Sequence, residues 1–317
     1  MNAPQAGTPS DPHPHRPGPH RVALAAAALT WPLLFLGGLV TTYKVGMAVP
    51  DWPSTFGENM FLYDFTRSAF GVVLEHSHRL LGAGVGLASI ALAVWFTWSE
   101  PRRWVVALGW VALLGVIIQG ILGGFRVRLN STVLAAVHGC SGQAVFGLLV
   151  LLCVLTGRSW REPKPGAGGR AGGLAVGVLA LVYAQVVAGA WLRHFGSGPA
   201  LIFHGTLAAV VVVAATTLGV RVGRGGPGMA DLIGPSRALA ATLLGQVMLG
   251  LAAWWTLRPF EALTPTVALI RTGHQANAAL VLASAVVLTA RAWRAHPASR
   301  SSSTVGVSAR PELEAVT

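Results

Sequence analysis

Long apolar runs dominate this sequence and limit what it can fold into. The run at about 69–98 would, as an α-helix, cross the roughly 30 Å apolar core of a bilayer. Seven similar runs lie at about 22–43, 104–124, 132–156, 173–192, 200–220, 237–255 and 266–290. Only 11% of the residues are charged, whereas about a quarter are charged in a soluble domain. Barrel strands are much shorter than these runs, so we predict an all-α integral membrane protein with eight transmembrane helices.

The segments outside these runs divide the chain into tails, a linker and two halves. Residues 1–21 are rich in Pro, His and Gly, which predicts a disordered tail. Residues 157–172 form a polar linker, and residues 291–317 form a polar C-terminal tail. Between them lie an N-terminal half, 22–156, and a C-terminal half, 173–290, each with four predicted helices. The first run is too long for a signal-peptide core, so we expect it to be retained as a span.

The basic residues predict how the helices are oriented. The formal net charge is +12, but Lys and Arg are scattered through the connections, which argues against a nucleic-acid partner. Fifteen of them lie on the side of the two tails and six on the other side. Because basic connections stay inside the cell, we predict that both termini are cytoplasmic. Residues 1–21 lack the Ser-rich amphipathic character of a transit peptide, which favours a bacterial cytoplasmic membrane.

The segment Glu75-His76-Ser77-His78-Arg79 places ionisable groups inside an apolar run. Such groups are costly at membrane depth and are functional candidates for that reason. In a helix, Glu75, His78 and Arg79 share one face, whereas His76 lies well round from His78. A carboxylate in this place can accept a proton beside whatever group the imidazole of His78 holds.

Three more histidines, His138, His204 and His274, occur in later runs. Together with His78, they fall within about five to eleven residues of the predicted outer end of alternate helices, which places all four in the outer half of the bilayer. One such histidine is easily explained as a packing residue, but four at a matched depth indicate a site.

An internal repeat accompanies these histidines. In three places a glutamine, with a glycine four residues later, precedes a histidine: Gln119 and Gly123 before His138, Gln185 and Gly189 before His204, and Gln246 and Gly250 before His274. The Gln-to-His separation is nineteen residues in the first two copies. This repeat predicts two pseudo-symmetric four-helix bundles, each contributing two histidines.

Two inward histidines in a four-helix bundle can clamp haem iron between their imidazoles. Zinc or copper fits less well, because a third protein ligand is needed and only Glu75 stands near His78. Arg79 and Arg271 each lie within about a turn of a histidine and have the planar fork that binds a propionate. An Arg79–Glu75 ion pair, or snorkelling to the interface, explains these arginines equally well.

With these residues in place, the chain resembles the haem A synthase family. The resemblance covers about 29–290, and its most specific elements are the Pro50-Asp51-Trp52-Pro53 loop, Glu75-x-x-His78-Arg79, Gln119 to Gly124, His138-Gly139, His204-Gly205 and His274. Members of this family have eight helices in two pseudo-symmetric halves. They oxidise a methyl group of haem O to the formyl group of haem A, which terminal oxidases use.

The resemblance implies a role for each candidate residue. Haem O, the substrate, would lie in the N-terminal half, and haem b, a resident cofactor, in the C-terminal half. The implied roles are Glu75 as the catalytic carboxylate, His78, His138 and Arg79 at haem O, and His204, His274 and Arg271 at haem b. Haem O synthase and an electron-transfer protein are implied as partners. Many bacterial members carry a cysteine pair in the first outer loop, and residues 44–68 have none, so a mechanism that needs that pair cannot operate here.

Two other functions are compatible with four intramembrane histidines. A di-haem b-type cytochrome that only transfers electrons, for instance from quinol, needs the same ligands but no Glu75. A transporter with duplicated halves could relay protons through the histidines, although no helix is broken at the midplane. The Pro- and Trp-rich loop within 44–67 is predicted to be ordered, either as a lid over the bundle or as an interfacial anchor.

Overall fold

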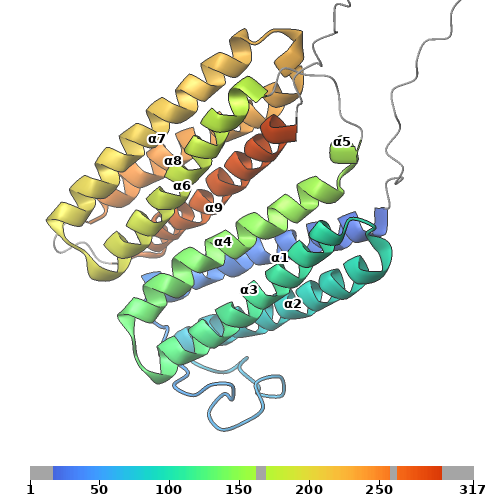
Figure 1. The fold of residues 1–317 in the computed structure, drawn as a ribbon. Coiled ribbons are helices and arrows are strands. Elements are labelled where there is room, and N and C mark those ends of the chain that lie inside the picture. Colours follow the sequence, from blue (N-terminus) through green and yellow to red (C-terminus); the bar gives the residue numbers. More distant parts are fainter. Residues whose placement is uncertain (1–16, 162–168, 258–262, 295–317) are drawn as a thin grey trace, which may run out of the picture.

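The computed structural model describes residues 17–161, 169–257 and 263–294. Its helices are α1 Pro17–Thr42, α2 Phe70–Ser99, α3 Arg103–Arg128, α4 Thr132–Thr156, α5 Arg158–Arg161, α6 Gly169–Phe195, α7 Gly198–Arg224, η1 Pro227–Met229 (a 3₁₀ turn), α8 Ala230–Trp255 and α9 Pro265–Arg294. Within these residues, eight helices are long and apolar enough to cross a membrane. The predicted all-α architecture with eight membrane-spanning helices is therefore confirmed for the described residues, and Figure 1 shows how these helices are arranged.

Several helices extend beyond the apolar runs that predicted them. Helix α1 begins at Pro17, so the last five residues of the predicted tail 1–21 are helical. Proline is compatible with the first turn of a helix, where the missing N–H has no partner to lose. Helix α8 begins at Ala230 instead of about 237, and α9 continues to Arg294. Hydropathy follows only the apolar part of a helix, whereas backbone hydrogen bonding continues through its polar ends. The remainder of both predicted tails and residues 162–168 of the linker lie outside the described residues.

The long helices form two bundles with the same order of contacts. In the first, α1 and α3 each pack against α2 and α4; in the second, α6 and α8 each pack against α7 and α9. The bundles meet where α1 and α4 lie against α9, and α4 also against α6 (Figure 1). Buried apolar side chains fill each bundle, such as Phe96 and Leu149 in the first and Leu218 and Leu239 in the second. Large apolar side chains on the outer surfaces suit a lipid environment, in which the solvent is itself apolar.

The connection between α1 and α2 lies at one end of the first bundle (Figure 1). Asp51 organises a turn in it, because its carboxylate accepts hydrogen bonds from the backbone of Phe56 at 2.8 Å and of Gly57 at 2.9 Å, and from the hydroxyl of Ser54. Partial burial acts to raise the pKa of Asp51, but these hydrogen bonds outweigh it and lower the pKa to about 2. Gly57 has a positive φ of 82°, which glycine adopts without strain.

The same connection is anchored on helix α2 through His76. This side chain is fully buried, its Nδ1 lies 3.2 Å from the hydroxyl of Thr55, and the rings of Tyr63 and Phe65 pack on it. The loop is therefore ordered by side-chain contacts. His76 packs against this loop and does not share the face of α2 that carries His78.

Candidate functional site

The four histidines come together as two pairs, one in each bundle. His78 of α2 and His138 of α4 have ring centroids 6.5 Å apart with an angle of 86° between the ring planes. His204 of α7 and His274 of α9 have centroids 6.3 Å apart at 81°. In both bundles the paired helices face each other across the interior, between two other helices. The pairs therefore have nearly the same geometry, although they share no residues.

This separation fits one metal atom held between two imidazoles. Two metal–nitrogen bonds of about 2 Å each, with about 1.1 Å from each nitrogen to its ring centroid, bring the centroids roughly 6 Å apart. Nδ1 of His78, His138 and His274 is buried without a hydrogen bond of standard geometry. In the described part of the chain, no three His, Cys, Asp or Glu side chains converge as metal ligands. The donors thus fit a haem iron, whose porphyrin supplies the other ligands, better than zinc.

All four histidines lie near the same end of the bundles. They occur six to nine residues after the first residue of their helices, which corresponds to about 9–14 Å along the axis. Hydrogen bonds join these helix ends: Thr42 pairs with Thr272 at 3.0 Å, and Arg126 donates to the carbonyl of Gly46 at 2.9 Å. The connection between α1 and α2 lies at this end as well, so the loop covers the end of the bundle that holds the first histidine pair.

Glu75 is a buried carboxylate with both oxygens occupied. Its side chain is 3% exposed; one oxygen accepts from the guanidinium of Arg79 at 2.9 Å and the other from the backbone N–H of Val49 at 3.0 Å. Arg79 also donates to the carbonyls of Val49 and Asp51 at 2.7 Å each, and of Ser54 at 3.2 Å. The Glu75–Arg79 ion pair, which the sequence offered as one explanation of Arg79, is present. Together with the other bonds of these two residues, it fastens the outer loop to the helix of His78.

The two arginines predicted at haem propionates make local contacts in the structure. Arg79 directs its two terminal nitrogens to the loop and to Glu75. Arg271, one turn before His274, donates to the hydroxyl and the carbonyl of Thr256 at the end of α8. Both arginines therefore secure chain segments at the histidine end of their bundles, and their contact with a propionate stays a prediction.

Comparisons with known proteins identify the family of this chain. Residues 20–309 match the family described as cytochrome oxidase assembly protein, COX15-CtaA. The chain belongs to this family. Proteins named heme A synthase are similar to it: that of Alkalihalophilus pseudofirmus is 31% identical over 170 residues, which are 51% of this chain and 55% of the relative. That of Exiguobacterium sibiricum is 30% identical over 169 residues, 52% of this chain and 56% of the relative. That of Symbiobacterium thermophilum is 28% identical over 256 residues, 75% and 74% of the two chains.

In the first two of these matches the chain spans only about half the length of its relative. The predicted resemblance to the haem A synthases is nevertheless confirmed at the level of the family, because the cytochrome oxidase assembly match covers most of the chain. A family match assigns no function to individual residues, so the roles of the four histidines, Glu75 and the arginines stay predictions.

Two half-buried arginines at this end of the protein were not predicted as site residues from the sequence. Arg126 lies within electrostatic reach of Glu75 and His78, besides its bond to the loop. Arg193 of α6 donates to the carbonyl of Gly38 at 2.8 Å and to the hydroxyl of Thr42 at 2.6 Å, which ties the two bundles together. The apolar runs end before both arginines, so the sequence places them in the connections between helices. Each lies about one helical turn after the glycine of a Gln-x-x-x-Gly repeat, and this position could have indicated that they belong to the site.

The glutamines of the repeat lie beside the histidines or their neighbours. Nε2 of Gln185 is 3.2 Å from Nδ1 of His204, and that of Gln246 is 3.5 Å from Nε2 of His274. Two of the glutamines also bond to the residue three positions after a histidine. Gln119 donates to Ser141, which follows His138, and Gln246 accepts from Asn277, which follows His274. A fourth copy of the repeat lies on α1 before His78. It was not recognised in the sequence because Leu33 stands where the other copies have glutamine, although Gly37 stands in the position of the glycine.

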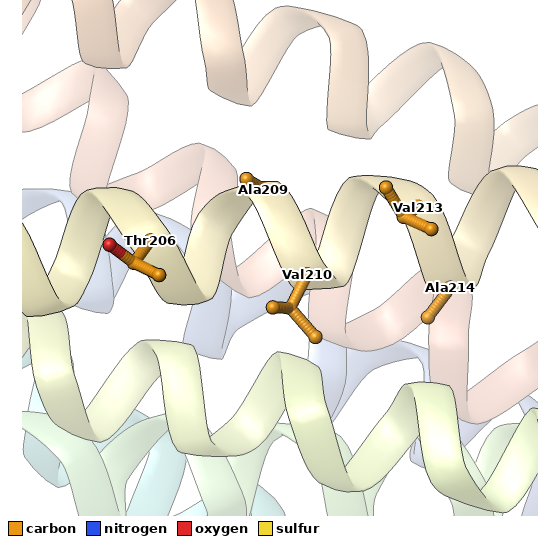
Figure 2. Close-up of a pocket in the computed structure, with 5 residues that line it drawn as sticks. All are labelled: Thr206, Ala209, Val210, Val213 and Ala214. Atoms are coloured by element: carbon orange, nitrogen blue, oxygen red, sulfur yellow. The ribbon is translucent and has the colours of Figure 1, made fainter.

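The two bundles differ in one respect that matters for chemistry. Glu75 precedes His78 by three residues, whereas Leu201 stands three residues before His204. Figure 2 shows the cavity on α7, lined by Thr206, Ala209, Val210, Val213 and Ala214. Its lining is apolar apart from one hydroxyl and contains no titratable group, so it does not add a second reaction site.

Proposed function

We propose that this protein is a haem A synthase, which oxidises a methyl group of haem O to the formyl group of haem A. The observation that carries the proposal is the unequal pair of sites. Both bundles hold two histidines at the separation of a bis-imidazole clamp. Among the residues that the structure describes, only the first bundle has a buried carboxylate within one helical turn of a histidine of its pair, which is Glu75. An electron carrier needs two equivalent clamps and no carboxylate. An enzyme that also relays electrons needs one clamp with a carboxylate for the reaction and one clamp without it for electron transfer.

The proposal divides the work between the halves. The N-terminal half, 22–156, binds haem O between His78 and His138, and the C-terminal half, 173–290, holds a resident haem b between His204 and His274. When bound, haem b supplies reversible one-electron transfer. His78 and His138 would hold the haem substrate, and His204 and His274 would hold the resident haem. Glu75, one helical turn before His78, would serve the substrate as a proton acceptor.

Proton removal is the step assigned to Glu75. Converting a methyl to a formyl group, written with water as the oxygen donor, releases four protons and four electrons. The carboxylate of Glu75 takes up a proton, and the electrons leave through an electron-transfer partner. Protonation breaks its ion pair, but Arg79 keeps the carbonyls of Val49, Asp51 and Ser54 as acceptors. The positive charge of Arg79 therefore stays satisfied in both protonation states of Glu75, and the loop stays closed.

The proposed location is a bacterial cytoplasmic membrane, with both termini in the cytoplasm and the histidine pairs toward the outer leaflet. The support is the asymmetry of basic residues between the connections. A reporter that is active only outside the cytoplasm should be active when fused after Asn59 and silent when fused after Gly168. The opposite pattern would place the histidine pairs near the cytoplasmic leaflet and refute this orientation.

Haem A production tests the proposal directly. A bacterial host that contains a haem O synthase but makes no haem A should accumulate haem A when it expresses this chain. Val213→Ala, on the outward side of α7, serves as a matched variant with an unchanged product. If the purified protein carries haem b and no haem A forms, the chain is a di-haem cytochrome. If it binds no haem, the transporter interpretation gains support.

A further inference from the structure

Each of the four histidines packs against a glycine on the helix before its own. A Cβ atom added to Gly37 of α1 would lie 2.9 Å from Cε1 of His78, and one added to Gly123 of α3 would lie 3.2 Å from Cε1 of His138. Carbon atoms pack favourably at about 3.5–4.0 Å. No side chain larger than hydrogen therefore fits at either glycine unless the imidazole moves.

The second bundle repeats the same contact. A Cβ on Gly189 of α6 would lie 3.0 Å from Cε1 of His204, and one on Gly250 of α8 would lie 2.9 Å from Cε1 of His274. Not every helical glycine is crowded in this way. Gly177 of α6 and Gly205 of α7 have nothing within 4 Å of such an atom. A glycine weakens a helix relative to alanine, so its use at all four histidines requires a local reason.

A glycine also exposes the backbone of its helix to the imidazole. The backbones of Leu33, Gln119 and Gln246, each four residues before the contacting glycine, lie beside the rings of His78, His138 and His274. These are the histidines whose Nδ1 is buried without a bond of standard geometry. A metal-binding histidine usually donates its second ring N–H to a carbonyl or carboxylate, which fixes the tautomer and leaves the other nitrogen for the metal. At His204 the side chain of Gln185 approaches both ring nitrogens instead.

We propose that Gly37, Gly123, Gly189 and Gly250 are positioning residues for the four imidazoles. Each admits a ring edge against the helix backbone and so sets the direction in which the ligating nitrogen points. The inference rests on the proposed haem ligation and adds what holds the ligands in place. It also explains why two pairs built from different residues have nearly equal centroid separations and inter-ring angles.

The test compares two alanine substitutions on one helix. Gly189→Ala places a methyl group against His204, whereas Gly177→Ala places it in open space. We expect purified full-length Gly189→Ala protein to lose haem b to an excess of a haem-scavenging protein about 10- to 100-fold faster than the parent, as typical for loss of a group that orients a ligand. Its low-spin absorption should also change, and Gly177→Ala should match the parent in both respects. Equal behaviour of the two variants overturns the proposal.

A stability measurement separates the contact from haem binding. Gly189→Ala should lower the unfolding temperature of the haem-depleted protein, but not in a His204→Ala background, where the methyl group meets no ring and alanine favours the helix. An equal loss in both backgrounds means that the methyl group acts elsewhere, and it overturns the positioning role. If the coupling appears but the parent binds no haem, the packing contact is real. In that case the proposed function fails, and the role toward a ligand fails with it.

Discussion

Glu75→Gln should stop the oxidation of haem O while both histidine pairs still bind haem. Glutamine keeps the size of glutamate and one acceptor oxygen, but it cannot take up a proton. A positioned general base contributes about 10²- to 10⁴-fold to a rate, so haem A formation should fall by that factor. Haem O or a partly oxidised haem should accumulate in its place. The measurement is the haem composition of membranes that contain matched amounts of parental and variant protein.

The substitution also disturbs an ion pair, and a control is needed for that effect. The amide N–H₂ must face either Val49 N–H or the Arg79 guanidinium, both of which are donors. Removing one partner of a buried pair can cost about 3–5 kcal/mol, so protein amounts have to be measured. Arg79→Gln breaks the same pair but leaves the carboxylate. If well-expressed Glu75→Gln protein makes haem A at the parental rate, Glu75 is a structural partner of Arg79 and not the base.

Replacing either His204 or His274 with alanine should remove the low-spin bis-histidine absorption of the resident haem. In the proposed site, each imidazole is one of the two protein ligands of the haem, and no third donor converges there among the described residues. The absorption spectrum of the reduced, purified protein measures this change. His76→Ala is the matched control, because His76 is buried in contact with the outer loop and belongs to neither pair. An unchanged spectrum in both His204→Ala and His274→Ala would remove the assignment of haem b to this half.

The number and approximate position of the membrane helices followed from the sequence alone, because hydropathy is a local property. The fourth run was predicted at 132–156 and is helix Thr132–Thr156. The ends of other helices were missed where polar residues continue the helix. The start of α8 at Ala230 is an example, since Asp231 and Pro235 lie in its first two turns. These residues have no apolar signal, although the backbone hydrogen bonds pass through them.

The candidate site was predictable where residue types repeat and not where contacts are long-range. The four histidines were found because they recur at one depth, and the Glu75–Arg79 pair follows from helical spacing. The loop bonds of Arg79 join residues up to 30 positions apart, and a sequence does not reveal which carbonyls a guanidinium will meet. Gly37 was missed for a related reason. Its partner His78 is 41 residues away, and Leu33 hides its place in the repeat.

In the proposed function, the two halves of the protein hold different haems for different purposes. Extraction and identification of the haems from purified His78→Ala and His274→Ala proteins, side by side with the parent, tests it most directly. The parent should yield haem b together with haem O, haem A or a partly oxidised haem. His78→Ala should keep haem b and lose the others, whereas His274→Ala should lose haem b and retain haem O. If both variants lose the same haem, or if the parent yields haem b alone, the proposed division between a substrate half and a cofactor half is wrong.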